Sequence, residues 1–358
     1  MSKFLKEKYR ALAPYTPGEQ PQDKKYIKLN TNESPYPPSK KAIEEAAEEL
    51  LKSQLYPDPD ATRLIDTLAH TYGVGRENII VTNGSDEVLN FAFMAYCDEN
   101  TPAVFPDITY GFYKVFADIN RVGAKVIPLK EDLTIDIDEY IKAKGTVILA
   151  NPNAPTGIAL PLSEIERLVL SDRERIVVID EAYVDFGAES AVGLTKKYDN
   201  LLITMTFSKS RSMAGARLGF GIGSKALIED LSRIKYSTNP YNVNRVTAAM
   251  GVGALLDKEY FDKNIAEIKS TRAKTEKALN GLGFELTPSR ANFLFAKSEK
   301  IAGEELYLKL KECGILVRHF KSPRISDYVR ITVGAPEEMQ ALVYTVKEIL
   351  EEKKYENS

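Results

Sequence analysis

The chain is 358 residues long, with 44% hydrophobic and 28% charged residues and a net charge of −3. A length above one ordinary core predicts one large and one smaller domain, and the nearly balanced charge excludes the basic surface that nucleic-acid binding would need. The two histidines are too few for a histidine-based metal site or a Ser-His-Asp triad, so we expect no metal.

The composition also predicts a cytoplasmic protein without a membrane span. Cys97 and Cys313 lie far apart and lack metal-type spacing, which favours buried, reduced thiols. The longest uncharged run, residues 145–163, contains three prolines and two asparagines and cannot form a spanning helix.

Two helices are predicted near the start of the chain. The first covers residues 39–55, with Ser39 as a suitable N-cap. An apolar stripe runs along it, formed by Ile43, Ala46, Ala47, Leu50 and Leu51. The second helix ends near Gly73 and carries Leu64, Ile65, Leu68 and Ala69.

A series of short apolar runs follows, and helical stretches alternate with them. The runs cover residues 79–82, 103–105, 124–128, 146–150, 176–180, 201–207 and 218–223. Because they lack polar alternation, they fit strands that are covered on both faces. We therefore predict a large α/β domain over residues 30–240, with a mostly parallel mixed sheet flanked by helices.

The pattern changes near residue 240. Two long helical patterns occupy residues 243–281, and strand-like runs follow at 293–296, 315–320 and 328–334. This order favours a smaller α+β domain. We assign it residues 241–358 together with an N-terminal arm, residues 1–29.

Polar side chains gather where the strands of the predicted sheet end, which is where open α/β sheets bind ligands. The segment NGSDE (83–87) leads into a helix whose free N–H groups can hold an anion. The other strand ends supply Asn151, then Asp180 with Tyr183, and then Ser208 with Lys209, and Arg217 follows.

Each of these residues has an ordinary structural explanation, such as a helix cap or a core aromatic. Together they match what pyridoxal phosphate requires. A lysine forms a Schiff base with the aldehyde, and a carboxylate keeps the ring nitrogen protonated. A phenol and an amide bond the ring hydroxyl, and a serine, an arginine and a helix N-terminus hold the phosphate.

Seven motifs give the sequence a resemblance that covers nearly the whole chain. They are LNTNESPYPPS (29–39), LYPDPDATRL (55–64), NGSDE (83–87), NPNAPTG (151–157), VVIDEAYVDF (177–186), TFSKSRSMAGARLGFGIG (206–223) and YVRITVG (328–334). They resemble the fold-type I, pyridoxal-phosphate-dependent aminotransferases of the aspartate aminotransferase superfamily. More narrowly, they are similar to the histidinol-phosphate aminotransferase family.

The resemblance implies a role for each matching residue. Lys209 would be the Schiff-base lysine, Asp180 would pair the pyridine nitrogen, and Asn151 and Tyr183 would contact the ring hydroxyl. Tyr110 would stack on the ring, and the phosphate would be bound by Ser85, Asp86, Ser208 and Arg217.

The resemblance also implies a substrate pocket and a homodimer. Tyr56 would reach the cofactor of the partner subunit. Arg330 would hold the acid group of the substrate and Arg318 would be a second basic contact. Weaker substrate candidates are Tyr15, Asn32 and Tyr241. No role is assigned to Arg211.

The expected reaction is a transamination between L-histidinol phosphate and 2-oxoglutarate, with glutamate as the amino partner, in histidine biosynthesis. One alternative is an aromatic amino-acid aminotransferase, and a second is an O-phosphothreonine decarboxylase on the same scaffold. A third alternative, a regulator that binds the cofactor without catalysis, is disfavoured by the intact set of Lys209, Asp180 and Arg330.

Overall fold

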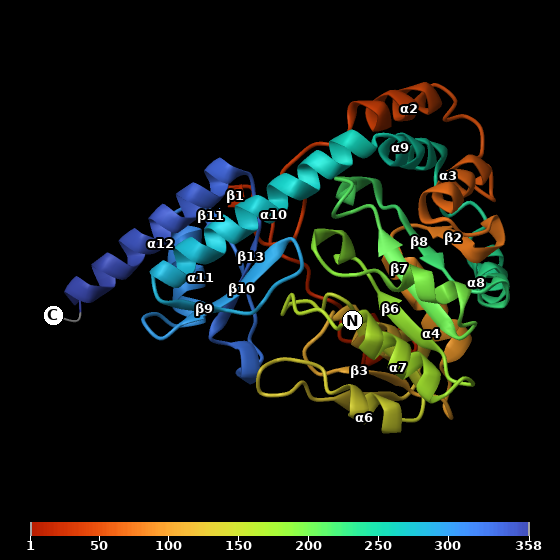
Figure 1. Cartoon of the computed structure of the whole chain (residues 1–358), viewed down its shortest axis with the longest axis horizontal. Helices are drawn as coiled ribbons and strands as arrows, with labels where there is room; N and C mark the ends of the chain where they lie inside the picture. Colours follow the sequence, from red (N-terminus) through yellow and green to blue (C-terminus); the bar gives the residue numbers. More distant parts are fainter. Residues whose placement is uncertain (1, 357–358) are drawn as a thin grey trace.

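The computed structural model describes residues 2–356 and has a seven-stranded sheet in its larger part (Figure 1). From one edge to the other the strands are β2 (Ile79–Thr82), β8 (Gly219–Ile222), β7 (Leu201–Thr206), β6 (Val177–Asp180), β5 (Thr146–Ala150), β3 (Ala103–Pro106) and β4 (Ala124–Ile127). Only β8 runs antiparallel to its neighbours. The mostly parallel mixed sheet is as predicted.

Helices cover both faces of this sheet, which explains why its central strands are buried and mostly apolar. One face packs against α4 (Ser85–Tyr96), α5 (Phe112–Asn120) and α8 (Lys225–Thr238). The other packs against α3 (Thr62–Tyr72), α6 (Ile137–Lys142), α7 (Leu162–Ser171) and α9 (Arg245–Leu256). The sheet therefore has a separate hydrophobic core on each side.

The register of the sheet aligns the carboxyl ends of β5, β6 and β7. Asp180 is paired with Ala150 of β5 on one side and with Thr204 of β7 on the other. Residues that follow β5, β6 and β7 therefore emerge side by side at the carboxyl edge of the sheet.

The smaller part contains a four-stranded antiparallel sheet in the order β12 (Arg318–His319), β13 (Tyr328–Thr332), β10 (Phe293–Ser298) and β9 (Phe284–Leu286). It packs with α10 (Lys258–Gly281), α11 (Gly303–Glu312) and α12 (Pro336–Glu356) (Figure 1). The single strand predicted over 315–320 is divided between two sheets, because β11 (Ile315–Leu316) pairs instead with β1 (Ile27–Lys28). A short helix, α1 (Glu7–Arg10), lies in the N-terminal arm.

The boundary predicted near residue 240 precedes α9, yet α9 packs against α2 (Lys40–Leu50) and α3 of the larger part. The contact with α2 is close, because a Cβ on Gly253 would collide with the backbone at Lys41 and Ala42. The long helix α10 then runs from α9 to the smaller sheet (Figure 1).

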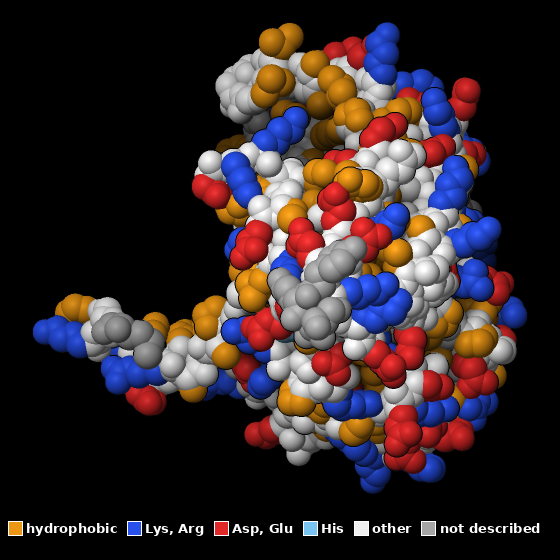
Figure 2. Space-filling view, turned by 90° about the vertical axis from the view of Figure 1, so that its left-hand side faces the viewer, with side chains coloured by type: hydrophobic (Ala, Val, Ile, Leu, Met, Phe, Trp, Pro, Cys, Tyr) orange, Lys and Arg blue, Asp and Glu red, His pale blue; other side chains and the backbone are white. Residues whose placement is uncertain are grey.

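Ser39 caps α2 as predicted, and its Oγ accepts a hydrogen bond from the Ala42 nitrogen at 3.2 Å. The helix ends at Leu50 rather than at residue 55. Its apolar stripe faces outward, since Ile43, Leu50 and Leu51 are 51%, 61% and 84% exposed. Figure 2 shows hydrophobic side chains gathered at the top of the molecule, where Figure 1 places α2.

Two further expectations concern the environment of the chain. Cys97 is buried as expected, but Cys313 is exposed just beyond α11, so the prediction of two buried thiols was wrong. Between residues 2 and 356, no helix is both long enough and apolar enough to cross a membrane.

Candidate active site

A cavity of about 260 Å³ lies at the carboxyl edge of the seven-stranded sheet. Among its lining residues are most of those that the sequence predicts to bind the cofactor: Ser85, Asp86, Tyr110, Asp180, Tyr183, Ser208, Lys209 and Arg217. They come from the ends of different strands, as expected for a ligand site in an open α/β sheet.

Lys209 follows β7 and lines the cavity. Its Nζ donates one hydrogen bond, to the backbone oxygen of Thr31 at 3.2 Å. Burial, together with the nearby Arg330 guanidinium, lowers the pKa of this amine to about 8, against the opposing carboxylate of Glu33. Arg217 also lowers this pKa, but by less than Arg330 does.

This pKa predicts how the protein without cofactor reacts with pyridoxal phosphate. Only a neutral amine attacks an aldehyde, so we expect the capture rate to rise about tenfold per pH unit below pH 8 and to level off above it. Rapid-mixing absorbance measures this rate, and free N-acetyl-lysine under the same conditions corrects for titration of the cofactor. A rate that continues to rise to pH 10 would show an ordinary lysine.

Asp180 ends β6 and is 4% exposed. Its Oδ1 accepts hydrogen bonds from the Ala182 nitrogen at 3.2 Å and from Thr204 Oγ1 at 3.4 Å. Its Oδ2 accepts one from the Tyr113 hydroxyl at 3.0 Å. Burial raises the pKa of this carboxyl to about 6, and the bond from Tyr113 opposes the rise. Tyr113 is not among the residues predicted from the sequence, although it lies one turn beyond Tyr110 in the same segment.

Tyr183 and Asn32 form a pair. Asn32 Nδ2 donates to the Tyr183 hydroxyl at 3.0 Å, and Asn32 Oδ1 accepts from Thr332 Oγ1 at 3.0 Å. Asn32 is buried. Its described contacts therefore place it behind Tyr183, where it orients the phenol that faces the cavity.

An anion cradle is built where β2 leads into α4. The first N–H groups of a helix have no partner within the helix, so Ser85 and Asp86 present theirs to the cavity. Arg217 reaches the same place, with Nη2 3.1 Å from Asp86 Oδ2 and Nη1 3.4 Å from Ser208 Oγ. Gly219 makes this possible, because a Cβ there would collide with the backbone nitrogen of Ser85.

Tyr110 covers one side of the cavity. Its hydroxyl donates to Asp86 Oδ1 at 2.8 Å, and its ring stands at 88° to that of Tyr113, with the centroids 5.7 Å apart. Tyr15 of the N-terminal arm stacks on Phe112, with ring centroids 4.4 Å apart, and lies 6.2 Å from the Tyr110 ring. The N-terminal arm thus lies against Tyr110, which covers one side of the cavity.

Asn151 is the predicted cofactor ligand that the structure does not bring to the cavity. Its Oδ1 accepts from the Leu160 nitrogen at 2.7 Å, and its Nδ2 donates to the Leu160 oxygen at 3.4 Å. Ala150 and Ala154 line the cavity on either side of it. The amide of Asn151 therefore holds the 151–160 loop, and its contact with the ring hydroxyl stays a prediction.

The two arginines expected to bind substrate differ in how they are engaged. Arg330 donates from Nη2 to the Asn30 oxygen at 2.9 Å, while its buried Nε has no partner among the described residues. Arg318 donates to the Pro17 and Thr16 oxygens, both at 3.1 Å. Arg330 therefore has a free donor for an oxyanion, whereas Arg318 fastens the N-terminal arm.

Tyr56 and Tyr241 lie outside this cavity. Their rings stack with centroids 4.6 Å apart, and the side chains are 78% and 42% exposed. In this subunit they form a surface pair rather than part of the substrate pocket.

Arg211, which the sequence left without a role, is structural. Its Nη1 donates to the Ala254 oxygen at 3.1 Å, and its guanidinium lies 4.1 Å from the centre of the Phe261 ring. It therefore ties the segment after Lys209 to α9 and α10.

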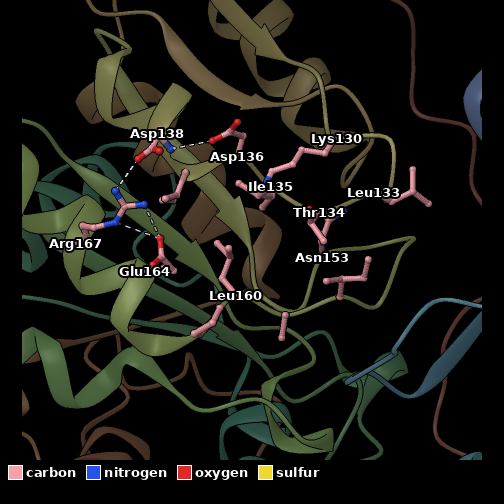
Figure 3. Close-up of a pocket in the computed structure, with 14 residues that line it drawn as sticks. Lys130, Leu133, Thr134, Ile135, Asp136, Asp138, Asn153, Leu160, Glu164 and Arg167 are labelled. Atoms are coloured by element: carbon pink, nitrogen blue, oxygen red, sulfur yellow. Dashed lines mark hydrogen bonds and ion pairs between the residues drawn. The ribbon is translucent and has the colours of Figure 1, made fainter.

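A second cavity, of about 310 Å³, lies between the 130–138 segment and α7 (Figure 3). Its main charges are satisfied by one another, since Arg167 pairs with Asp138 at 2.6 Å and with Glu164 at 2.8 Å. In the cavity lined by Lys209 and Asp180, by contrast, ionisable side chains with shifted pKa values surround a single cavity, which is typical of a functional site.

Comparison with known proteins identifies the family of the chain. The sequence profile described as "Aminotransferase class I and II" matches residues 24–346. The chain belongs to this family. It is a pyridoxal-phosphate-dependent aminotransferase of fold type I, which confirms the predicted fold class, enzyme class and cofactor.

Individual proteins within this similarity include histidinol-phosphate aminotransferases. A histidinol-phosphate aminotransferase from Brachyspira hyodysenteriae is 49% identical over 354 residues, which are 98% of this chain and 99% of the relative. The same enzyme from Sinorhizobium meliloti, solved in complex with pyridoxal-5'-phosphate, superposes with a TM-score of 0.85 at 22% identity over 92% of each chain. An L-threonine-O-3-phosphate decarboxylase from Porphyromonas gingivalis has a TM-score of 0.78 at 24% identity, covering 91% of this chain and 99% of its own. The two solved structures support the fold alone.

The residues of the cavity fit this cofactor. An amine with a lowered pKa, Lys209, lies in the same cavity as a buried carboxylate, Asp180, and the helix N-terminus with Arg217 supplies donors for a phosphate. The steric requirement at Gly219 shows that the backbone is shaped to form this cradle.

Proposed function

We propose that the protein moves an amino group between L-histidinol phosphate and 2-oxoglutarate, with glutamate as the partner, in histidine biosynthesis. The observation that carries the choice of substrate is the 49% identity to a histidinol-phosphate aminotransferase over nearly the full length of both chains. The geometry supports the same class of reaction, because Lys209, Asp180 and Tyr183 line one cavity.

Bound pyridoxal phosphate supplies an aldehyde that attaches to amino groups and a ring that draws electrons from the substrate's Cα. Lys209 would hold the cofactor through its Nζ amine, which lines the cavity. As a free amine of lowered pKa, it is also the base that removes the Cα proton and returns it in the reverse direction. Asp180 would hold the ring nitrogen, and Tyr183, oriented by Asn32, would bond the ring hydroxyl.

The substrate is oriented by charge. Arg330, with its unpartnered Nε, binds an acid group of the substrate in bidentate fashion. Arg318 lies beside Arg330 on the paired strand β12. When substrate binds, a second oxyanion takes the place of the Thr16 and Pro17 carbonyl oxygens as the hydrogen-bond acceptor of Arg318.

Steady-state assays with histidinol phosphate, phenylalanine and tyrosine as amino donors and 2-oxoglutarate as acceptor test the choice of substrate. We expect the largest kcat/KM with histidinol phosphate. A much larger value for the aromatic amino acids, or release of CO₂ from O-phosphothreonine without a keto acid, would replace the proposal with one of the two alternatives.

We also propose a cytoplasmic homodimer in which Tyr56 reaches the partner's active site. The outward apolar face of α2 and the 78% exposure of Tyr56 support this arrangement (Figure 2). Tyr56→Ala subunits mixed with Lys209→Ala subunits should regain activity that neither variant has alone, because a hybrid dimer contains one intact site. Tyr344→Ala, which changes a 63% exposed tyrosine on α12, should leave activity and sedimentation unchanged.

A further inference from the structure

The Tyr113 hydroxyl is the feature of the site that neither the sequence motifs nor the proposed reaction accounts for. Tyr113 lies in the first turn of α5 and is fully buried. Its ring packs edge-on against Phe105 and Tyr110, with centroids 6.0 and 5.7 Å away. Its hydroxyl donates to Asp180 Oδ2 at 3.0 Å.

Packing explains the ring but not the hydroxyl. Tyr140 is buried to the same degree in another part of the core, and its hydroxyl has no hydrogen-bond partner among the described residues. A buried phenol in this chain is therefore tolerated without a partner, so the contact with Asp180 calls for a separate reason.

The surroundings of Asp180 supply that reason. Its carboxylate is removed from water, Glu181 follows it in the chain, and Asp86 lines the same cavity. Burial and the neighbouring carboxylates both disfavour the ionised form of Asp180. The hydrogen bond that the Tyr113 hydroxyl donates to Oδ2 favours the ionised form of Asp180 and restricts the rotation of its carboxylate.

We propose that Tyr113 is a positioning residue that keeps Asp180 ionised and oriented toward the basic nitrogen of the cofactor ring. It acts through Asp180, and the inference depends on the cofactor assignment of the proposed function. The N-terminal turn of α5 and the short segment before it then serve two carboxylates, because Tyr110 donates to Asp86 while Tyr113 donates to Asp180.

The test is the affinity of the cofactor-free protein for two ligands, pyridoxal phosphate and its 1-deaza analogue, in which a C–H replaces the ring nitrogen. Equilibrium dialysis gives the dissociation constants. In Tyr113→Phe we expect the constant for pyridoxal phosphate to rise about tenfold or more, the scale of one hydrogen bond to a charged group. The constant for the analogue should stay the same, because the analogue offers Asp180 no basic nitrogen.

Two further variants separate this role from a structural one. Tyr140→Phe removes a buried hydroxyl without a partner and should bind both ligands like the wild type. In an Asp180→Asn background, Tyr113→Phe should have no further effect, since the two side chains act as a pair.

Equal loss for both ligands, or an undiminished effect in the Asp180→Asn background, would show that Tyr113 is structural and would overturn the inference. An unchanged affinity for pyridoxal phosphate would overturn it as well. If the wild type itself fails to bind pyridoxal phosphate, the cofactor assignment fails instead. The two failures are thereby distinguished without a substrate assay.

Discussion

Lys209→Ala is expected to lower kcat/KM by about 10⁴-fold with every amino donor, because it removes both the attachment point of the cofactor and the base at Cα. The visible absorbance of the bound cofactor should also shift, since no covalent link to the protein can form. Steady-state rates and an absorbance spectrum of the reconstituted protein measure the two effects.

The same substitution should not weaken the fold. The Lys209 amine is removed from water and has one described hydrogen bond, to the Thr31 oxygen. A group whose folded pKa is lowered costs stability below that pKa, and the cost disappears as the pH rises from about 8 toward the unfolded value. The cofactor-free variant should therefore match or exceed the wild type in Tm at pH 7 and lose that advantage by pH 10.

Lys235→Ala is the matched control. Lys235 is also buried, in α8, and its Nζ donates to the Pro59 oxygen at 2.9 Å, outside the cavity. This variant should keep its kcat/KM, because Lys235 does not line the cavity. If Lys209→Ala retained the wild-type rate, the assignment of the catalytic lysine would be wrong.

Lys209 and Asp180 could be placed from the sequence because each lies at or just beyond the carboxyl end of a strand, and the register of β5, β6 and β7 brings those ends to one edge. Neither position depends on a side-chain rotamer. The fold class followed from the same apolar runs, because strands covered on both faces lack polar alternation.

What the sequence missed depends on tertiary partners. In the 151–157 loop, residue spacing does not reveal that the Asn151 amide pairs with the Leu160 backbone. Tyr113 lies within one turn of Tyr110, and spacing alone does not reveal that its hydroxyl meets Asp180.

The helix α2 shows the same limit at the level of packing. Its stripe was recognisable from the spacing of apolar residues, but spacing does not identify the partner that a stripe faces. Ala42 faces α9 inside the chain, while Ile43 and Leu51 remain exposed. The run over 315–320 likewise contained strand residues, but nothing in it indicated that the chain would pass from one sheet to another after Leu316.

Arg330→Ala is expected to lower kcat/KM by about 10³-fold in both half-reactions, because a buried charge pair that loses one partner costs several kcal/mol. Arg330→Lys should recover only part of this, since an ammonium cannot bind an oxyanion with two parallel hydrogen bonds. Steady-state kinetics with glutamate and with histidinol phosphate measure the losses.

Arg175→Lys controls for the removal of a buried guanidinium. Arg175 is 6% exposed, has a buried Nε without a described partner, as Arg330 does, and donates to the Tyr140 and Ala143 oxygens. Because Arg175 lies outside the cavity, Arg175→Lys should lower Tm and leave kcat/KM unchanged.

Arg318→Ala should affect catalysis less than Arg330→Ala, because the donors of Arg318 already hold the N-terminal arm. A larger loss from Arg318→Ala than from Arg330→Ala would reverse the assignment of the two arginines.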